Sequence, residues 1–180
     1  VSPHPLSEID STLFGRKGRS IVKSLDKGRN YSDWYTPTDP DIGNAISVVA
    51  LNNNKVIIGY EATGGKRGFY LTEVSGGVAT SKKIGDIVVD WPNISFGYDR
   101  YPHYGQGDKI VLMSEYGLRD PLVNFPRHLH VYEESRDMFR TIFELPVQDP
   151  TNTHLHGAHY DQYNDTVWVC NGDMKTACNL

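Results

Sequence analysis

Three histidines near the C-terminal end of the chain have the residue type and the spacing that metal binding needs. His154 and His156 lie two residues apart, and His159 follows three residues later. Because side chains alternate between the two faces of a β-strand, His154 and His156 would point to the same side. Imidazole nitrogens bind zinc and related metals, and Asp161 could add an oxygen ligand. We therefore predict His154, His156 and His159 as metal ligands; the alternative is that they hydrogen-bond the backbone of a packed strand.

A second histidine pair, His128 and His130, has the same two-residue spacing. In a strand, these two imidazoles would also share one face. We expect this pair on the third strand of a sheet, farther from a central axis than the first group. It is therefore the weaker of the two metal candidates.

The loop from Tyr98 to Asp108 collects side chains that suit a carbohydrate ligand. Aromatic rings stack on sugar faces, while Asp, Arg and Gln side chains hydrogen-bond hydroxyl groups. The predicted ligand-binding residues are Tyr98, Asp99, Arg100, Tyr101, His103 and Tyr104. The alternative is a packed surface loop whose tyrosines cover the edge of a sheet. Trp34, Tyr35 and Trp91 are expected to pack between sheets instead.

Composition excludes several classes of partner. The chain has 180 residues, with 18 basic and 22 acidic side chains and a formal charge of −4. A general attraction to nucleic acid or to an anionic membrane is therefore not expected. No apolar run reaches the roughly 18–20 residues that span a bilayer, so membrane insertion is not expected. The two cysteines, Cys170 and Cys178, are too few for a disulfide scaffold, and we expect free thiols.

The elements that position these residues are predicted to be β-strands throughout. Turn residues separate short runs rich in Val, Ile, Tyr and Phe, and no window keeps a helical apolar period. A short helical turn is considered only over Ser7–Phe14. The predicted strands are Ser20–Lys23, Ile46–Leu51, Val56–Tyr60, Gly68–Glu73, Ile94–Asp99, Lys109–Ser114, His128–Glu133, Thr141–Glu144, His156–Tyr160 and Thr166–Cys170.

The strands repeat as a unit of strand, polar turn and strand. Tyr98-Asp99 and Tyr160-Asp161 have the same neighbours, and each precedes a loop and an apolar strand. A third, weaker copy has Asn52-Asn53-Asn54 as its turn. Repetition of this kind indicates a fold built from similar sheets.

The segment Ser24–Tyr31 has the pattern Ser-x-Asp-x-Gly-x-x-aromatic, in which Ser24, Asp26, Gly28 and Tyr31 are the defining residues. Asp accepts hydrogen bonds from backbone N–H groups two residues on, Gly supplies a positive φ, and the aromatic ring packs the turn onto the sheet. Degenerate copies are at Thr72–Gly77 and Ser135–Phe139. This segment resembles the Asp-box of sialidase-like (BNR-repeat) β-propellers, where the box connects the third and fourth strands of a blade.

The resemblance extends roughly from Ser20 to Asp173 and implies an all-β propeller. We expect a lead-in over residues 1–19, followed over residues 20–180 by about three blades and a partial one, at about 50–60 residues a blade. Propellers close with typically about four to eight blades, so we expect part of a larger propeller, incomplete at the C-terminal end. The alternative fold is a β-sandwich of about ten strands.

Catalysis of the sialidase type needs three arginines, a Tyr nucleophile with its Glu, and an acid/base Asp. The Phe-Arg-Ile-Pro motif that carries the first of these arginines is absent. Hydrolysis in general needs only two carboxylates, and 22 acidic residues do not single out a pair. No catalytic residue is predicted. A non-enzymatic role is favoured, and a metal ion is the one cofactor considered.

The resemblance thus implies a non-catalytic module that binds a cell-surface glycan or wall polymer, as in phage receptor-binding and tail proteins. Its expected location is extracellular or on the virion surface. Two alternatives stay open: a glycoside hydrolase of the sialidase-like class, and a structural propeller that mediates assembly. A homo-oligomer also stays open, and it would be a trimer if the chain belongs to a phage fibre.

Overall fold

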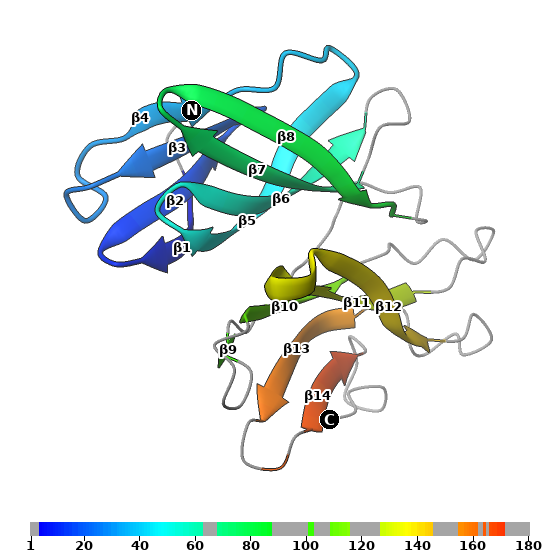
Figure 1. Cartoon of the computed structure of the whole chain (residues 1–180). Helices are drawn as coiled ribbons and strands as arrows, with labels where there is room; N and C mark the ends of the chain where they lie inside the picture. The colour runs from blue at the N-terminus through cyan, green and yellow to red at the C-terminus, as the bar shows by residue number, and fades with distance from the viewer. Residues whose placement is uncertain are drawn as a thin grey trace. The chain divides into compact units, whose positions relative to one another are not determined.

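The computed structural model describes residues 4–62, 68–87, 101–102, 109–115, 127–145, 155–161, 164 and 166–171. In this part the chain is all-β, with fourteen strands and one 3-10 turn (Figure 1). It divides into two compact units, Val1–Ile87 and Val88–Leu180. No helix among these residues has the length and apolar character to cross a membrane.

Sheet 1 opens the first unit as a four-stranded antiparallel meander. Its strands follow one another in space as in the sequence: β1 (His4–Ile9), β2 (Thr12–Lys17), β3 (Ser20–Ser24) and β4 (Ser32–Tyr35). The β1–β2 connection is a two-residue turn in which Asp10 and Ser11 both have positive φ. This geometry matches the twist of a hairpin.

The first two strands of sheet 1 correct two expectations. Residues 4–17, predicted as a lead-in with a short helical turn at Ser7–Phe14, are instead paired strands. Pro5 and the polar residues around it weaken the strand pattern in the sequence. The structure accommodates Pro5 because β1 is an edge strand and its pairing is irregular between Pro5 and Ser7.

Sheet 2 is a second antiparallel meander, formed by β5 (Ile42–Asn52), β6 (Lys55–Ala62), β7 (Gly68–Ser75) and β8 (Val78–Gly85). Asn53-Asn54 turns the chain from β5 to β6, as the polar run predicts. Gly76 and Gly77, both with positive φ, turn it from β7 to β8. Consecutive residues of β6, Val56, Ile57 and Ile58, are all buried, so both faces of this strand are covered.

The core of the first unit lies between sheets 1 and 2, where β5 packs against β1, β2 and β3. Phe14 and Ile21 from sheet 1 meet Ile42, Val48 and Ile58 from sheet 2. Full burial of such side chains contributes about 1.5–3 kcal/mol each. Hydrogen bonds also join the two sheets: the Arg16 guanidinium donates to the carbonyl oxygens of Ala45 (3.1 Å) and Ile46 (2.8 Å).

The second unit holds sheets 3 and 4. Sheet 3 is again an antiparallel meander, formed by β9 (Tyr101–Pro102), β10 (Lys109–Ser114), β11 (Arg127–Glu133) and β12 (Met138–Leu145). Sheet 4 is the hairpin of β13 (Leu155–Asp161) and β14 (Thr166–Asn171). Leu112, Leu129 and Val131 of sheet 3 form a core with Leu155 and Ala158 of β13.

Nine of the ten predicted strands are present with bounds that differ by at most a few residues, and Ile94–Asp99 lies outside the described residues. In each of the three described four-stranded sheets, a turn named in the sequence connects the third strand to the fourth. These turns are Ser24–Tyr31, the end of Thr72–Gly77, and the segment Glu134–Asp137, which includes the 3-10 turn η1 (Glu134–Arg136). None of the described sheets closes on itself.

Candidate functional site

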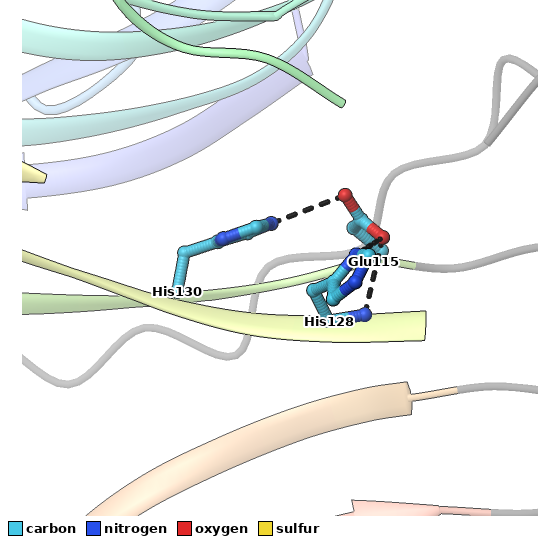
Figure 2. Close-up of side chains that lie close together, drawn as sticks. All are labelled: Glu115, His128 and His130. Atoms are coloured by element: carbon cyan, nitrogen blue, oxygen red, sulfur yellow. Dashed lines mark hydrogen bonds and ion pairs between the residues drawn. The ribbon is translucent and has the colours of Figure 1, made fainter. Parts of the chain in front are cut away.

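Sheet 3 brings together Glu115, His128 and His130, which we call the histidine–glutamate cluster. Glu115 directly follows β10, and its backbone N–H donates to the carbonyl oxygen of His128 (3.0 Å), which continues the β10–β11 pairing by one residue. His128 and His130 lie two residues apart on β11 and therefore share a face. Leu129 and Val131 point the other way, into the core with β13. The cluster therefore lies on the face of β11 opposite β13 (Figure 2).

The Glu115 carboxylate lies between the two imidazole rings, with one oxygen toward each (Figure 2). Oε2 is 2.9 Å from His128 Nδ1, and Oε1 is 3.1 Å from His130 Nε2. Oε2 also accepts the backbone N–H of His128 at 3.1 Å. The side chains of Glu115, His130 and His128 are 0%, 3% and 12% exposed, so this is a largely buried ionisable cluster.

The second nitrogen of each ring faces β12. His130 Nδ1 is 3.1 Å from Thr141 Oγ1, and His128 Nε2 is 3.5 Å from Glu144 Oε2. These contacts follow from the strand register, which pairs His130 with Thr141 and His128 with Glu144. The His130 ring also stacks on Phe139, with 4.9 Å between ring centroids. Both rings are thus fixed in orientation by a neighbouring strand.

Two opposing effects act on the pKa of Glu115. Burial raises it, because a carboxylate loses hydration inside the protein. The hydrogen bonds and charge of His130, together with those of His128, lower it. The lowering effects prevail, so the pKa of Glu115 lies below its usual range and the cluster holds a carboxylate anion.

Two imidazole nitrogens and a carboxylate within 4.8 Å of one another have the chemistry of a metal-ligand set. The expected position of the His128–His130 pair, on the third strand of a sheet, is confirmed. Glu115 was not predicted. Its signal in the sequence is weak: an acidic residue one position beyond the predicted strand Lys109–Ser114.

The other predicted metal group stays a prediction. His154 lies outside the described residues. His156 and His159 are part of β13, where His159 pairs with Trp168, but their side chains are outside the described residues.

A second candidate site is an open pocket of about 450 Å³ in the first unit, which we call the aromatic pocket. It lies where the chain passes from β4 to β5, beside strands β7 and β8 of sheet 2. Its lining residues are Trp34, Tyr35, Thr36, Pro37, Thr38, Asp39, Ile42, Tyr70, Ala79 and Ser81. This volume falls in the range of small-molecule sites, about 300–1,000 Å³.

The aromatic side chains of this pocket are held by the core behind them. Trp34 packs edge-on against Phe14 at 5.2 Å between ring centroids, and Tyr70 packs edge-on against Tyr60 at 5.6 Å. Trp34 and Tyr35 also pack against the core between sheets 1 and 2, in agreement with their predicted role. The same two residues line the pocket, which the sequence did not reveal.

The polar side of the pocket is formed by the 36–39 connection and by β8. The Arg19 guanidinium donates to the carbonyl oxygens of Pro37 and Asp39 and so fixes this connection. Asp39 Oδ1 accepts the backbone N–H of Asp41 at 3.0 Å. Thr36, Thr38 and Ser81 also line the pocket, and the hydroxyls of Thr36 and Ser81 pair with those of Ser20 (2.7 Å) and Thr72 (2.9 Å).

The loop predicted to bind carbohydrate lies largely outside the described residues. Of its six predicted ligand-binding residues, Tyr101 forms part of β9, while the other five, Tyr98, Asp99, Arg100, His103 and Tyr104, lie outside the described part. Trp91 lies outside it as well. The carbohydrate-binding role of the loop residues and the packing role of Trp91 stay predictions.

The turn between β3 and β4 is held by Ser24 and Asp26. Ser24 Oγ accepts the backbone N–H of Gly28 at 2.8 Å and donates to Asp26 Oδ1 at 2.8 Å. Asp26 Oδ1 accepts the backbone N–H of Asn30 at 2.8 Å, four residues on rather than the two expected. The Asn30 side chain donates to Asp26 Oδ2 at 2.7 Å. These bonds and that of Ser24 lower the pKa of Asp26 to about 2.

Gly28 and Tyr31 complete this turn. Gly28 has φ +83°, as the pattern predicts for glycine. A Cβ added there would come within 3.1 Å of the Tyr31 hydroxyl and 3.2 Å of Leu13 Cδ1. The turn thus packs onto sheet 1, and its hydrogen bonds are internal, which gives it a structural role.

No protein-family model matches the chain, and no curated protein matches it. One similar solved structure is the extracellular domain of a protein from B. thetaiotaomicron described as a hybrid two-component system. It is 12% identical, with a TM-score of 0.42 over 96% of this chain. A second, described as a one-component system from the same organism, is 12% identical, with a TM-score of 0.40 over 94% of this chain. The chain spans 26% of the length of each. Sequence identity and TM-scores this low assign neither a family nor a function to the chain.

Proposed function

We propose that this chain is a β-propeller module that binds carbohydrate without hydrolysing it, and that sugar binds in the aromatic pocket. The observation that carries the proposal is the combination of Trp34, Tyr35 and Tyr70 with hydroxyl and carboxylate side chains around one open pocket. Aromatic rings offer apolar faces to the C–H groups of a sugar, and polar groups at the rim select its hydroxyls.

The propeller part of the proposal is supported by the repetition of the sheets. Each described four-stranded sheet is a meander of strands adjacent in the sequence, which is the topology of a propeller blade. The turn from the third strand to the fourth recurs in all three, and the first has the Ser24–Tyr31 pattern that resembles an Asp-box. Side chains on both faces of β6 are buried, as expected for a propeller blade that packs between two neighbouring blades.

The biological setting is proposed from the resemblance of Ser24–Tyr31 to sialidase-like propellers. Non-catalytic modules of this kind bind cell-surface glycans or wall polymers in phage receptor-binding and tail proteins. We place this chain in the same role, outside the cell or on a virion surface. As part of a phage fibre it would be a trimer.

The test incubates the purified chain with cell-surface polysaccharides and measures both its retention on each polymer and the length of the polymer chains. We expect retention on at least one polymer, with chain length unchanged. Shortened polymer or released sugar would identify a hydrolase and contradict the non-catalytic assignment. Absence of retention on every polymer tested would contradict the proposal in favour of an assembly role.

A matched pair of variants on β8 tests the pocket without disturbing the core. Ala79 and Ser81 line the pocket, whereas the exposed Thr80 between them points to the other face of the strand. The variant Ala79→Arg places a long side chain at the pocket and should reduce retention at least about tenfold, equivalent to a loss of about 1.4 kcal/mol of binding free energy. The variant Thr80→Arg adds the same charge and should retain wild-type binding.

A double variant addresses the loop predicted from the sequence. If Tyr101→Ala with His103→Ala abolishes retention while Ala79→Arg does not, the sugar binds at the 98–108 loop and not in the aromatic pocket. Equal loss with both would indicate that retention needs both sites. Melting temperatures of all variants separate lost binding from lost folding.

A further inference from the structure

We propose that Glu115, His128 and His130 form a zinc site in sheet 3. His128 Nδ1 and His130 Nε2 each contact the Glu115 carboxylate, and one ligand atom from each of the three residues lies within 4.8 Å of the others. A set of two histidines and one glutamate is one that Zn²⁺ uses in proteins, with water as a further ligand.

Two of the donor separations are close to those around a zinc ion. Ligands about 2.0–2.1 Å from a tetrahedral zinc ion lie roughly 3.3 Å from one another. The observed nitrogen–oxygen separations in the cluster are 2.9 Å and 3.1 Å. These two separations are within a few tenths of an ångström of that value, and the side chains would have to turn so that both nitrogens and one carboxylate oxygen face the same ion.

The second nitrogen of each imidazole is held as metal-binding histidines require. His130 Nδ1 is 3.1 Å from Thr141 Oγ1, and His128 Nε2 is 3.5 Å from the Glu144 carboxylate. Partners of this type fix the ring orientation and direct the other nitrogen's lone pair toward the metal. In this protein the strand register of β11 with β12 provides both.

The donor set favours zinc over calcium and magnesium. Calcium and magnesium prefer all-oxygen sites, which two imidazoles do not provide. The three ligands are on or next to the paired strands β10 and β11 and are largely buried, so a bound ion would join these two strands. We therefore expect the ion to stabilise sheet 3.

The test uses the whole chain, first dialysed against a chelator and then titrated with Zn²⁺ by calorimetry. We expect one Zn²⁺ per chain and a melting temperature that rises with Zn²⁺. The absorption bands of bound Co²⁺ should indicate tetrahedral coordination by nitrogen and oxygen. A folded wild-type chain that takes up no Zn²⁺ would overturn the proposal and leave the cluster as a metal-free hydrogen-bonded group.

Near-isosteric variants then assign the ligands. Glu115→Gln and His128→Gln should abolish Zn²⁺ uptake, with folding confirmed by circular dichroism in the presence of chelator. Because Glu115 is fully buried and its variant could fail to fold, Glu144→Gln provides a second measurement at a side chain that is 62% exposed. Loss of this positioning carboxylate should weaken Zn²⁺ binding roughly 10–100-fold.

The control replaces His154, His156 and His159 together by Ala. If this variant keeps full Zn²⁺ uptake while His128→Gln loses it, the ion is assigned to sheet 3. The reverse result would overturn the proposal and place the metal at the histidines singled out first in the sequence. The outcome is independent of carbohydrate binding, because the aromatic pocket is in the first unit and the cluster in the second.

Discussion

At the scale of single residues, Asp26 shows how one side chain organises a turn. Its two carboxylate oxygens accept from Ser24, from the Asn30 backbone and from the Asn30 side chain. All of these partners are within four residues, so the turn forms from local sequence. The lowered pKa of Asp26 shows that these donors stabilise its charged carboxylate.

This turn gives a pH-dependent prediction. The pKa of Asp26 is about 2 in the folded chain and 3.8 ordinarily, so its charge stabilises the fold above pH 3.8, and this stability is lost as the pH falls toward 2. Asp26→Asn should lower the melting temperature at neutral pH, because the new amide NH₂ faces the Asn30 side-chain donor. The difference from wild type should shrink between pH 4 and pH 2. Thermal unfolding monitored by circular dichroism checks this.

The control for this prediction is Asp33→Asn, at an exposed position on β4. It removes the same charge outside the turn and should leave the melting temperature nearly unchanged. A constant difference between Asp26→Asn and wild type across the acid range would show that the charge of Asp26 does not contribute to stability.

At the scale of elements, the long strand β5 depends on one close approach to β6. A Cβ added to Gly43 would come within 2.4 Å of the carbonyl oxygen of Glu61, a backbone atom in a paired strand. The register of β5 with β6 is irregular between Ile42 and Ala45, where this contact lies. Only glycine therefore fits at this position of the pair.

We expect Gly43→Ala to reduce the free energy of unfolding by about 2–3 kcal/mol, because the backbone of β6 must shift to relieve the overlap. Gly76→Ala is the control without a space conflict, since nothing lies within 4 Å of a Cβ added there. Its cost is limited to the positive φ, about 1 kcal/mol. Urea unfolding of both variants measures the two costs, and equal values would contradict the close approach.

At the scale of the whole molecule, the charge balance decides which polymers the chain can bind. With 18 basic and 22 acidic side chains, long-range attraction to polyanions is weak. We expect no retention on DNA or heparin at physiological salt. Retention on either, lost steeply as salt increases, would indicate an electrostatic surface and contradict the absence of a nucleic-acid partner.

The sequence alone determined the features that depend on neighbouring residues. Apolar runs between turn formers located nine described strands, and the Ser24–Tyr31 pattern located a turn between a third and a fourth strand. These predictions are correct because strand alternation and turn hydrogen bonds involve residues only a few positions apart. Five described strands escaped prediction: β1, β2, β4, β8 and β9. Pro5 weakens the pattern of β1, and β8 is exposed along most of its length and has no apolar run, so pairing with a neighbouring strand makes these segments β-strands.

The tertiary structure decided which distant residues meet. Glu115 reaches His128 and His130 only through the register of β10 with β11, and no pattern in the sequence fixes that register. The aromatic pocket similarly needs β4, its connection to β5, and strands β7 and β8 of sheet 2 at one place. Strand pairing and sheet packing are long-range contacts, so both candidate sites emerge only when the sheets assemble.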